Sequence, residues 1–156
     1  MPLHTFLQSA SFHLFLDETL LQQAEEAVRN YLDNHDKKAQ KNQLYAIQTA
    51  VQSRGWSGLK DLADNQQSKN SHETNKAFWQ FIASLIDTTG TPPDFSLIAS
   101  LRQVLSHHGW WEDENVTDRT EKNRRKKANR AVLDQVLPAA LPIYFEHFIC
   151  EYFYRT

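Results

Sequence analysis

The sequence predicts an all-α protein, a single-domain bundle of about five or six helices over residues 1–156. The length of 156 residues suits one ordinary domain and is sufficient to bury a core without disulfides or metal ions. Only four glycines and five prolines are present, which leaves few turn signals for a β fold. Apolar residues also recur at helical intervals along most of the chain.

The first part of the chain contains one clear helix and one ambiguous segment. Residues 18–33 carry an apolar face that consists of Leu20, Ala24, Ala27, Val28 and Tyr31. Asp17 or Thr19 is expected to cap this helix. In residues 1–16 the first apolar residues suit a helix, whereas residues 12–16 alternate as in a strand. We expect either a helix or an extended arm there.

The middle of the chain predicts three further helices separated by polar breaks. Residues 34–41 predict a polar turn, after which an apolar stripe ends at Gly55. Ser57 is expected to cap a shorter helix, and residues 66–71 to form a polar loop whose Ser71 caps the next helix. The apolar faces of these helices consist of Leu44, Ile47, Ala50 and Val51, then Leu59, Leu62 and Ala63, then Phe78, Phe81, Ile82 and Leu85.

Residues 88–93, Thr-Thr-Gly-Thr-Pro-Pro, are the strongest break in the chain and predict its main internal linker. Asp94 is expected to cap the following helix, which ends at Gly109. Residues 46–56 and 100–110 align without gaps, and both end in Gly-Trp. This similarity favours two helix C-caps with glycine in the left-handed position, and a duplicated helical unit is the alternative.

The last helix begins basic and ends aromatic. Asp118, with Glu121 three residues later, is a capping-box-like start. The apolar face beyond the basic part consists of Leu133, Leu137, Leu141, Phe145, Phe148 and Tyr152. Two prolines inside this helix each remove one backbone hydrogen bond, so a kink or a split is expected at Pro138 and Pro142.

The charge is concentrated in one segment of a chain whose net charge is only −2. Residues 119–130 contain one acid and seven cations, which are Arg119, Lys122, Arg124, Arg125, Lys126, Lys127 and Arg130. Such a cluster suits a nucleic-acid backbone, because Lys and Arg neutralise phosphates without reading sequence. The alternatives are a solvated helix start paired with the acids of residues 112–118, an acidic protein, or a membrane surface. A smaller cluster consists of Lys37, Lys38 and Lys41.

No motif of a known catalytic chemistry is present. The sequence contains no HExxH, paired CxxC, P-loop, GxGxxG or GxSxG pattern. We therefore expect no catalytic residue, no cofactor and no metal. The alternative is a small helical enzyme with a metal at His107, His108 and the nearby acids. Those two histidines are more typical of a solvated last helical turn.

Two further residue types bear on partners and location. Trp111 follows a helix end without a capping role, and it is the best candidate for an interface. Cys150 is the only cysteine and is expected to be buried and inert. The chain has no signal-like N-terminus and no apolar run of about 18 residues, so a cytoplasmic protein without membrane contact is expected.

Several segments resemble the small all-helical subunit of class 1 CRISPR effector complexes, above all that of the type III Cmr-like complexes. These segments are the helix from Leu21 to Val28, the charged linker 33–41, the helix running into Gly55-Trp56-Ser57-Gly58-Leu59, and the arginine-led helix from Arg130 to Leu133. The resemblance covers residues 18–86 and, more loosely, 128–153. It carries no catalytic motif.

The resemblance implies a non-catalytic subunit of a ribonucleoprotein. Such subunits stack with further copies and other subunits, and contact guide RNA and target RNA or DNA through basic faces. The expected function is therefore contact with the nucleic-acid backbone inside a CRISPR effector. The alternative is a helical protein-interaction module, such as an adaptor, inhibitor or antitoxin, whose basic helix binds an acidic protein.

Overall fold

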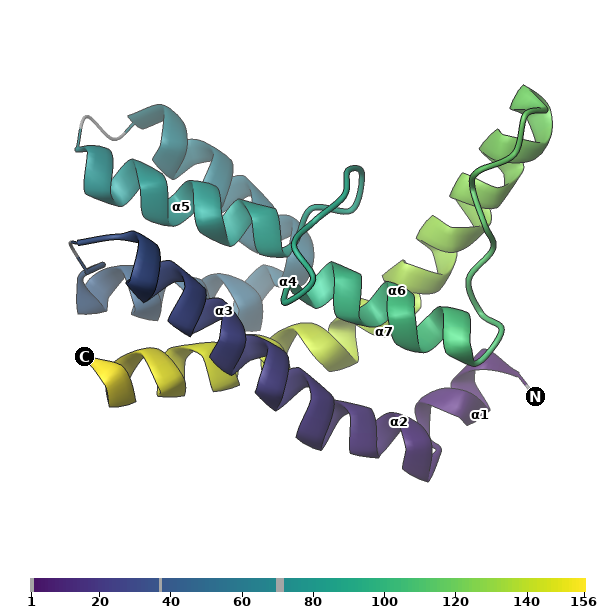
Figure 1. Ribbon diagram of the computed structural model, residues 1–156, viewed down its shortest axis with the longest axis horizontal. Helices are drawn as coiled ribbons and strands as arrows, with labels where there is room; N and C mark the ends of the chain where they lie inside the picture. Colours follow the sequence, from purple (N-terminus) through teal and green to yellow (C-terminus); the bar gives the residue numbers. More distant parts are fainter. Residues whose placement is uncertain (1, 37, 70–71) are drawn as a thin grey trace.

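The computed structural model describes residues 2–36, 38–69 and 72–156, and every regular element within them is helical (Figure 1). In chain order these are α1 (Leu3–Leu7), α2 (Ala10–Leu14), the π-helical turn η1 (Phe15–Thr19), α3 (Leu20–Asn34), α4 (Lys41–Lys69), α5 (Glu73–Leu85), α6 (Leu97–His107) and α7 (Arg119–Arg155). Because α2, η1 and α3 follow without a break, the described residues form six helical rods. The all-α prediction is confirmed.

The described N-terminal residues are helical and pack on the core, so of the two alternatives the helix is confirmed and the extended arm was wrong. Phe12 and Phe15 are buried with their ring centroids 5.9 Å apart, and Leu14 between them is 56% exposed. Ser9 caps α2 by accepting a hydrogen bond from the Phe12 amide at 3.2 Å. The predicted caps Asp17 and Thr19 lie inside the continuous helix η1–α3 instead.

Helix α4 changes direction at Gly55, as the sequence predicted. Gly55 has φ 64° and ψ −144°, a backbone conformation that residues with a side chain rarely adopt. The predicted loop at residues 66–71 was wrong over its first part, because α4 continues to Lys69. The predicted cap Ser71 lies outside the described residues, and the N-cap position of α5 is His72.

The ends of α6 follow standard capping geometry. Ser96, and not the predicted Asp94, caps its start by accepting from the Ala99 amide at 3.0 Å. Gly109 ends it with φ 80°, and the Trp110 amide donates to the Leu105 carbonyl at 2.7 Å. This is a Schellman cap, which folds the Trp110 ring back to within 6.2 Å of Phe6.

Helix α7 is continuous through both prolines, so of the predicted kink or split the split was wrong. Figure 1 shows that the helix bends between its green first half and its yellow second half, in keeping with the kink. Pro138 and Pro142 are exposed, and each lacks the amide that would close a helical hydrogen bond four residues back. The bend separates a basic part that extends from the body and an apolar part that enters the core.

The core consists of one cluster to which every helix contributes. Its aromatic centre is Phe78, whose ring lies 5.6 Å from that of Tyr31 and 6.2 Å from that of Tyr152. Burial raises the pKa of Tyr31 to about 12. The Tyr152 hydroxyl accepts from the Ala39 amide at 2.7 Å, so the end of α7 fixes the segment before α4. Within the described residues, no helix is long and apolar enough to cross a membrane.

Candidate nucleic-acid interface

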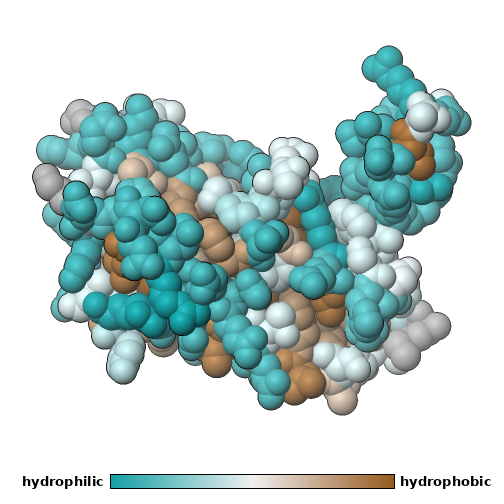
Figure 2. Space-filling view, viewed as in Figure 1, coloured by the Kyte–Doolittle hydropathy of each residue, from teal (hydrophilic) through white to brown (hydrophobic). Residues whose placement is uncertain are grey.

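The basic run lies on an arm, residues 112–130, that extends from the helical body (Figure 1). The arm consists of the acidic segment 112–118 and the first part of α7. Asp118 caps the helix by accepting from the Thr120 amide at 3.1 Å. The arm is hydrophilic over most of the face in Figure 2, and a hollow separates it from the body.

The acidic segment lies along α7 and, together with Glu121 of the helix, engages two of the predicted phosphate ligands. Arg124 pairs with Glu112 at 2.9 Å and with Glu121 at 2.7 Å. Arg125 pairs with Glu121 at 3.0 Å and donates to the Asp113 carbonyl at 2.8 Å. Hydrogen bonds from Arg124 and then Arg125 lower the pKa of Glu121 to about 2. Glu121 therefore pairs with these arginines and does not form the predicted capping box.

Asn129, which the sequence analysis did not single out, holds the acidic segment to the helix. Its side chain accepts from the Glu112 amide at 2.9 Å and donates to the Glu112 carbonyl and the Glu114 carboxylate, both at 2.8 Å. The residue is only 2% exposed. Because buried polar side chains need hydrogen-bond partners, a polar residue at a buried position of this helix indicates that an irregular segment packs beside it.

Arg130, the last cation of the run, is engaged at the junction of the arm and the body. Its guanidinium pairs with Asp134 at 3.0 Å and donates to the Thr88 hydroxyl at 2.8 Å. It also lies 4.5 Å from the centroid of the Trp56 ring, whose indole N–H donates to the Ile86 carbonyl at 2.9 Å. Arg130 therefore acts mainly as a structural contact between α7, α4 and the segment after α5.

The predicted linker, residues 88–93, is fixed to the body by Arg102. This side chain donates to the carbonyls of Thr88 and Gly90, both at 2.9 Å. Its guanidinium also lies 5.6 Å from the centroid of Trp111, the predicted interface residue. Trp111 is half-buried against the core, so only part of its ring is accessible.

Four cations of the run have no charged partner among the described residues: Arg119, Lys122, Lys126 and Lys127. At about 100° per residue, Arg119, Lys122 and Lys126 fall within about 60° of the helix circumference, and Arg125 lies about 60° beyond Lys122. Lys127 lies on the other flank, about 80° from Arg119 and about 60° from Arg124. All but Lys122 are exposed. We call these four residues the free cationic stripe.

The smaller basic cluster lies far from this stripe. Lys38 and Lys41 are exposed just before and at the start of α4, and Lys37 lies outside the described residues. Figure 1 shows the start of α4 at the opposite end of the molecule from the arm. The structure therefore does not bring the two clusters into one surface.

The alternative metal site does not assemble within the described residues, where no group of three metal-ligating side chains comes together. The ring of His108 lies 4.8 Å from that of Phe6, and His107 is exposed. Of the acids closest in sequence, the Glu112 carboxylate pairs with Arg124, and the Asp113 carboxylate accepts from the Asn115 amide.

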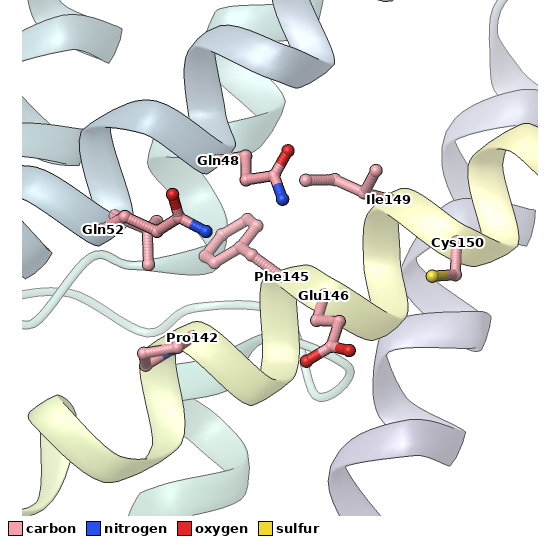
Figure 3. Close-up of a pocket in the computed structure, with 8 residues that line it drawn as sticks. Gln48, Gln52, Pro142, Phe145, Glu146, Ile149 and Cys150 are labelled. Carbon is pink, nitrogen blue, oxygen red and sulfur yellow. The ribbon is translucent and has the colours of Figure 1, made fainter.

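A hollow of about 380 Å³ lies between α4 and the second half of α7 (Figure 3). The amides of Gln48 and Gln52 reach over the Phe145 ring, and Glu146 and Cys150 stand at its edge. Cys150 is exposed, which corrects the expectation of a buried thiol. The lining offers amides and one carboxylate above an apolar floor.

The chain was compared with known protein families, curated proteins and solved structures, and no match was found.

Proposed function

We propose that this chain is a non-catalytic, nucleic-acid-binding subunit of a larger cytoplasmic assembly, and that the free cationic stripe binds the phosphate backbone. The observation that carries the proposal is the division of the basic run. Three of its cations have partners within the chain, whereas four are presented on an extended helix without any among the described residues. Unpaired like charges in a row repel one another, and an anionic partner relieves that repulsion.

The geometry favours binding of the backbone without recognition of sequence. Lysine and arginine side chains on one part of a helix match phosphates along a strand, and a single exposed amide, Asn123, accompanies them. The assembly we propose is a CRISPR ribonucleoprotein effector, in which the chain stacks with other subunits or further copies. This part of the proposal rests on the resemblance of its helices to the small subunit.

The test is the salt dependence of binding to labelled single-stranded and duplex oligonucleotides. The logarithm of the association constant is expected to fall linearly with the logarithm of salt concentration, with a slope of about −0.9 per phosphate contact on duplex. Four contacts therefore predict a slope of about −3.6. Absence of binding at low salt would contradict the proposal. Tight binding of an acidic protein that excess nucleic acid does not displace would favour the interaction-module alternative.

Neutralising the acidic segment is expected to strengthen binding. The double variant Glu112→Gln and Glu114→Gln keeps the hydrogen-bond acceptors for Arg124 and Asn129 but removes two negative charges beside the stripe. We expect an affinity gain of about tenfold at low salt, since each charge contributes roughly 0.6 kcal/mol or more at such distances. Fluorescence anisotropy with a labelled duplex measures it.

The matched control is Asp17→Asn with Glu18→Gln. These two exposed acids on η1 lie on the other side of the body from the arm, and their replacement changes the net charge equally. The control is expected to change affinity by less than about twofold, because charges beyond a Debye length are screened. An equal gain in both variants would indicate that net charge, and not the arm, determines binding.

A further inference from the structure

A depression of about 390 Å³ lies at the junction of the arm and the body. Its lining comes from three parts of the chain that are distant in sequence: the segment after α5, the segment after α6, and α7 itself. The residues are Thr88, Thr89, Trp111, Glu114, Lys126, Asn129, Arg130 and Leu133. Figure 2 shows the surface hollowed between the arm and the body. The depression therefore lies at the inner end of the free cationic stripe.

The polar lining suits one phosphate. Lys126 belongs to the stripe and has no charged partner among the described residues. Arg130 uses its Nε and Nη1 atoms for Asp134 and Thr88, so its Nη2 atom remains as a donor. The one carboxylate in the lining, Glu114, accepts from Asn129 at 2.8 Å. Lys126 and Arg130, which also pairs with Asp134 outside the depression, thus face one carboxylate, and an incoming phosphate gains charge-assisted hydrogen bonds from both.

The apolar lining suits a base. Trp111 contributes its ring to the depression, and Arg102 holds the ring in place by a contact at 5.6 Å. Leu133 adds a buried apolar surface below. An indole that is fixed and partly exposed beside two cations is a stacking platform of the kind that proteins use for unpaired bases.

We propose that this depression holds one nucleotide of a single strand, with its base against Trp111 and its phosphate between Lys126 and Arg130. This inference rests on the proposed function, because the strand reaches the depression along the free cationic stripe. A duplex cannot place a base in this depression, since its bases are paired and stacked. The chain is therefore expected to bind single strands in preference to duplexes of the same sequence.

The experiment compares three labelled probes: a single strand, a strand of equal length that lacks bases, and the duplex. The intact protein is expected to bind the single strand on the order of tenfold more tightly than the abasic strand. Trp111→Ala is expected to abolish that ratio and to leave affinity for the abasic strand and the duplex unchanged. Trp111→Phe retains a stacking ring and is expected to retain most of the ratio.

A second pair of variants avoids the half-buried tryptophan. Lys126→Ala and Lys127→Ala remove the same charge from adjacent exposed positions, but only Lys126 lines the depression. Lys126→Ala is expected to weaken single-strand binding several-fold more than duplex binding, whereas Lys127→Ala weakens both equally. A nucleoside monophosphate is expected to compete only weakly, because it lacks the adjoining phosphates that Arg119 and Lys122 bind.

The inference would be overturned by equal affinity of the intact protein for the single strand and the abasic strand, or by equal effects of the two lysine variants on both probes. Either result leaves the proposed function standing if all probes still bind with the expected salt dependence. Failure of the proposed function differs, because no probe then binds at low salt. An unchanged ratio in a folded Trp111→Ala variant would also overturn the assignment of the stacking ring.

Discussion

Replacing all four residues of the free cationic stripe with glutamine is expected to weaken nucleic-acid binding by roughly a hundredfold to a thousandfold at low salt. Each lysine or arginine beside an anionic surface contributes about 1 kcal/mol, and tenfold in affinity corresponds to about 1.4 kcal/mol. The quadruple variant is Arg119→Gln, Lys122→Gln, Lys126→Gln and Lys127→Gln. Its salt dependence is expected to be nearly flat, because each lost contact removes about 0.9 from the slope.

The fold of this variant is expected to remain intact. None of the four side chains has a charged partner among the described residues, and glutamine is a good helix former. Circular dichroism and thermal unfolding check this directly. Fluorescence anisotropy across a range of salt concentrations then gives both the affinity and the slope.

The matched control removes four cations from the body of the protein. The four cations lie on α3, α4 and α5, and each is replaced by glutamine: Arg29, Lys60, Lys69 and Lys76. The net charge changes by the same amount, but affinity is expected to fall by less than about threefold. A comparable loss in the control would mean that binding follows total charge, and would contradict the role of the arm.

Phe78→Ala is expected to lower the free energy of unfolding by about 3–5 kcal/mol. The Phe78 side chain has no solvent exposure and lies between rings of α3 and α7. Its truncation leaves a cavity at the point where α5 packs on both helices. Denaturant titration with the linear-extrapolation method measures the difference.

Tyr154→Ala is the control for the loss of an aromatic ring. Tyr154 is 85% exposed near the end of α7, and its truncation is expected to change stability by less than about 0.5 kcal/mol. Phe78→Leu retains most of the buried volume, and its loss of stability is expected to lie between those of Phe78→Ala and Tyr154→Ala. Equal stability of Phe78→Ala and the intact protein would contradict the arrangement of α3, α5 and α7 around one core.

Much of the fold follows from the sequence because its helices are amphipathic with a regular period. The apolar face predicted for residues 18–33 is buried in α3, and the glycines at the two Gly-Trp pairs have positive φ. The N-terminal segment was ambiguous because Leu14, one of the alternating apolar residues, is exposed on a helix whose buried positions are Phe12, Phe15 and Leu16. The end of α4 was missed because its polar residues carry no apolar period, although they are helical.

The sequence predicted which cations form the candidate site, but not which of them pair with acids of the same chain. A run of cations is visible in the sequence, and the acids before it indicated that some charges pair internally. Which ones pair depends on contacts such as that between Arg124 and Glu112, twelve residues apart across an irregular segment. The contact of Arg130 with Trp56 and Thr88 joins residues that no local pattern connects.

The arm is a lever that turns about its base at Arg130, because the next apolar residues of α7, Leu133, Val136 and Leu137, are buried in the core. About eleven residues separate Arg119 from Arg130, so at about 1.5 Å per residue the tip lies about 16 Å from the base. A rotation of about 10° at the base therefore displaces the tip by about 3 Å, close to the spacing of about 3.4 Å between phosphates along the axis of one strand of a duplex. The contacts of Arg130 with Trp56 and Thr88 fix the angle of the arm. A partner that alters those contacts at the base of the arm changes the register of its cations at the tip.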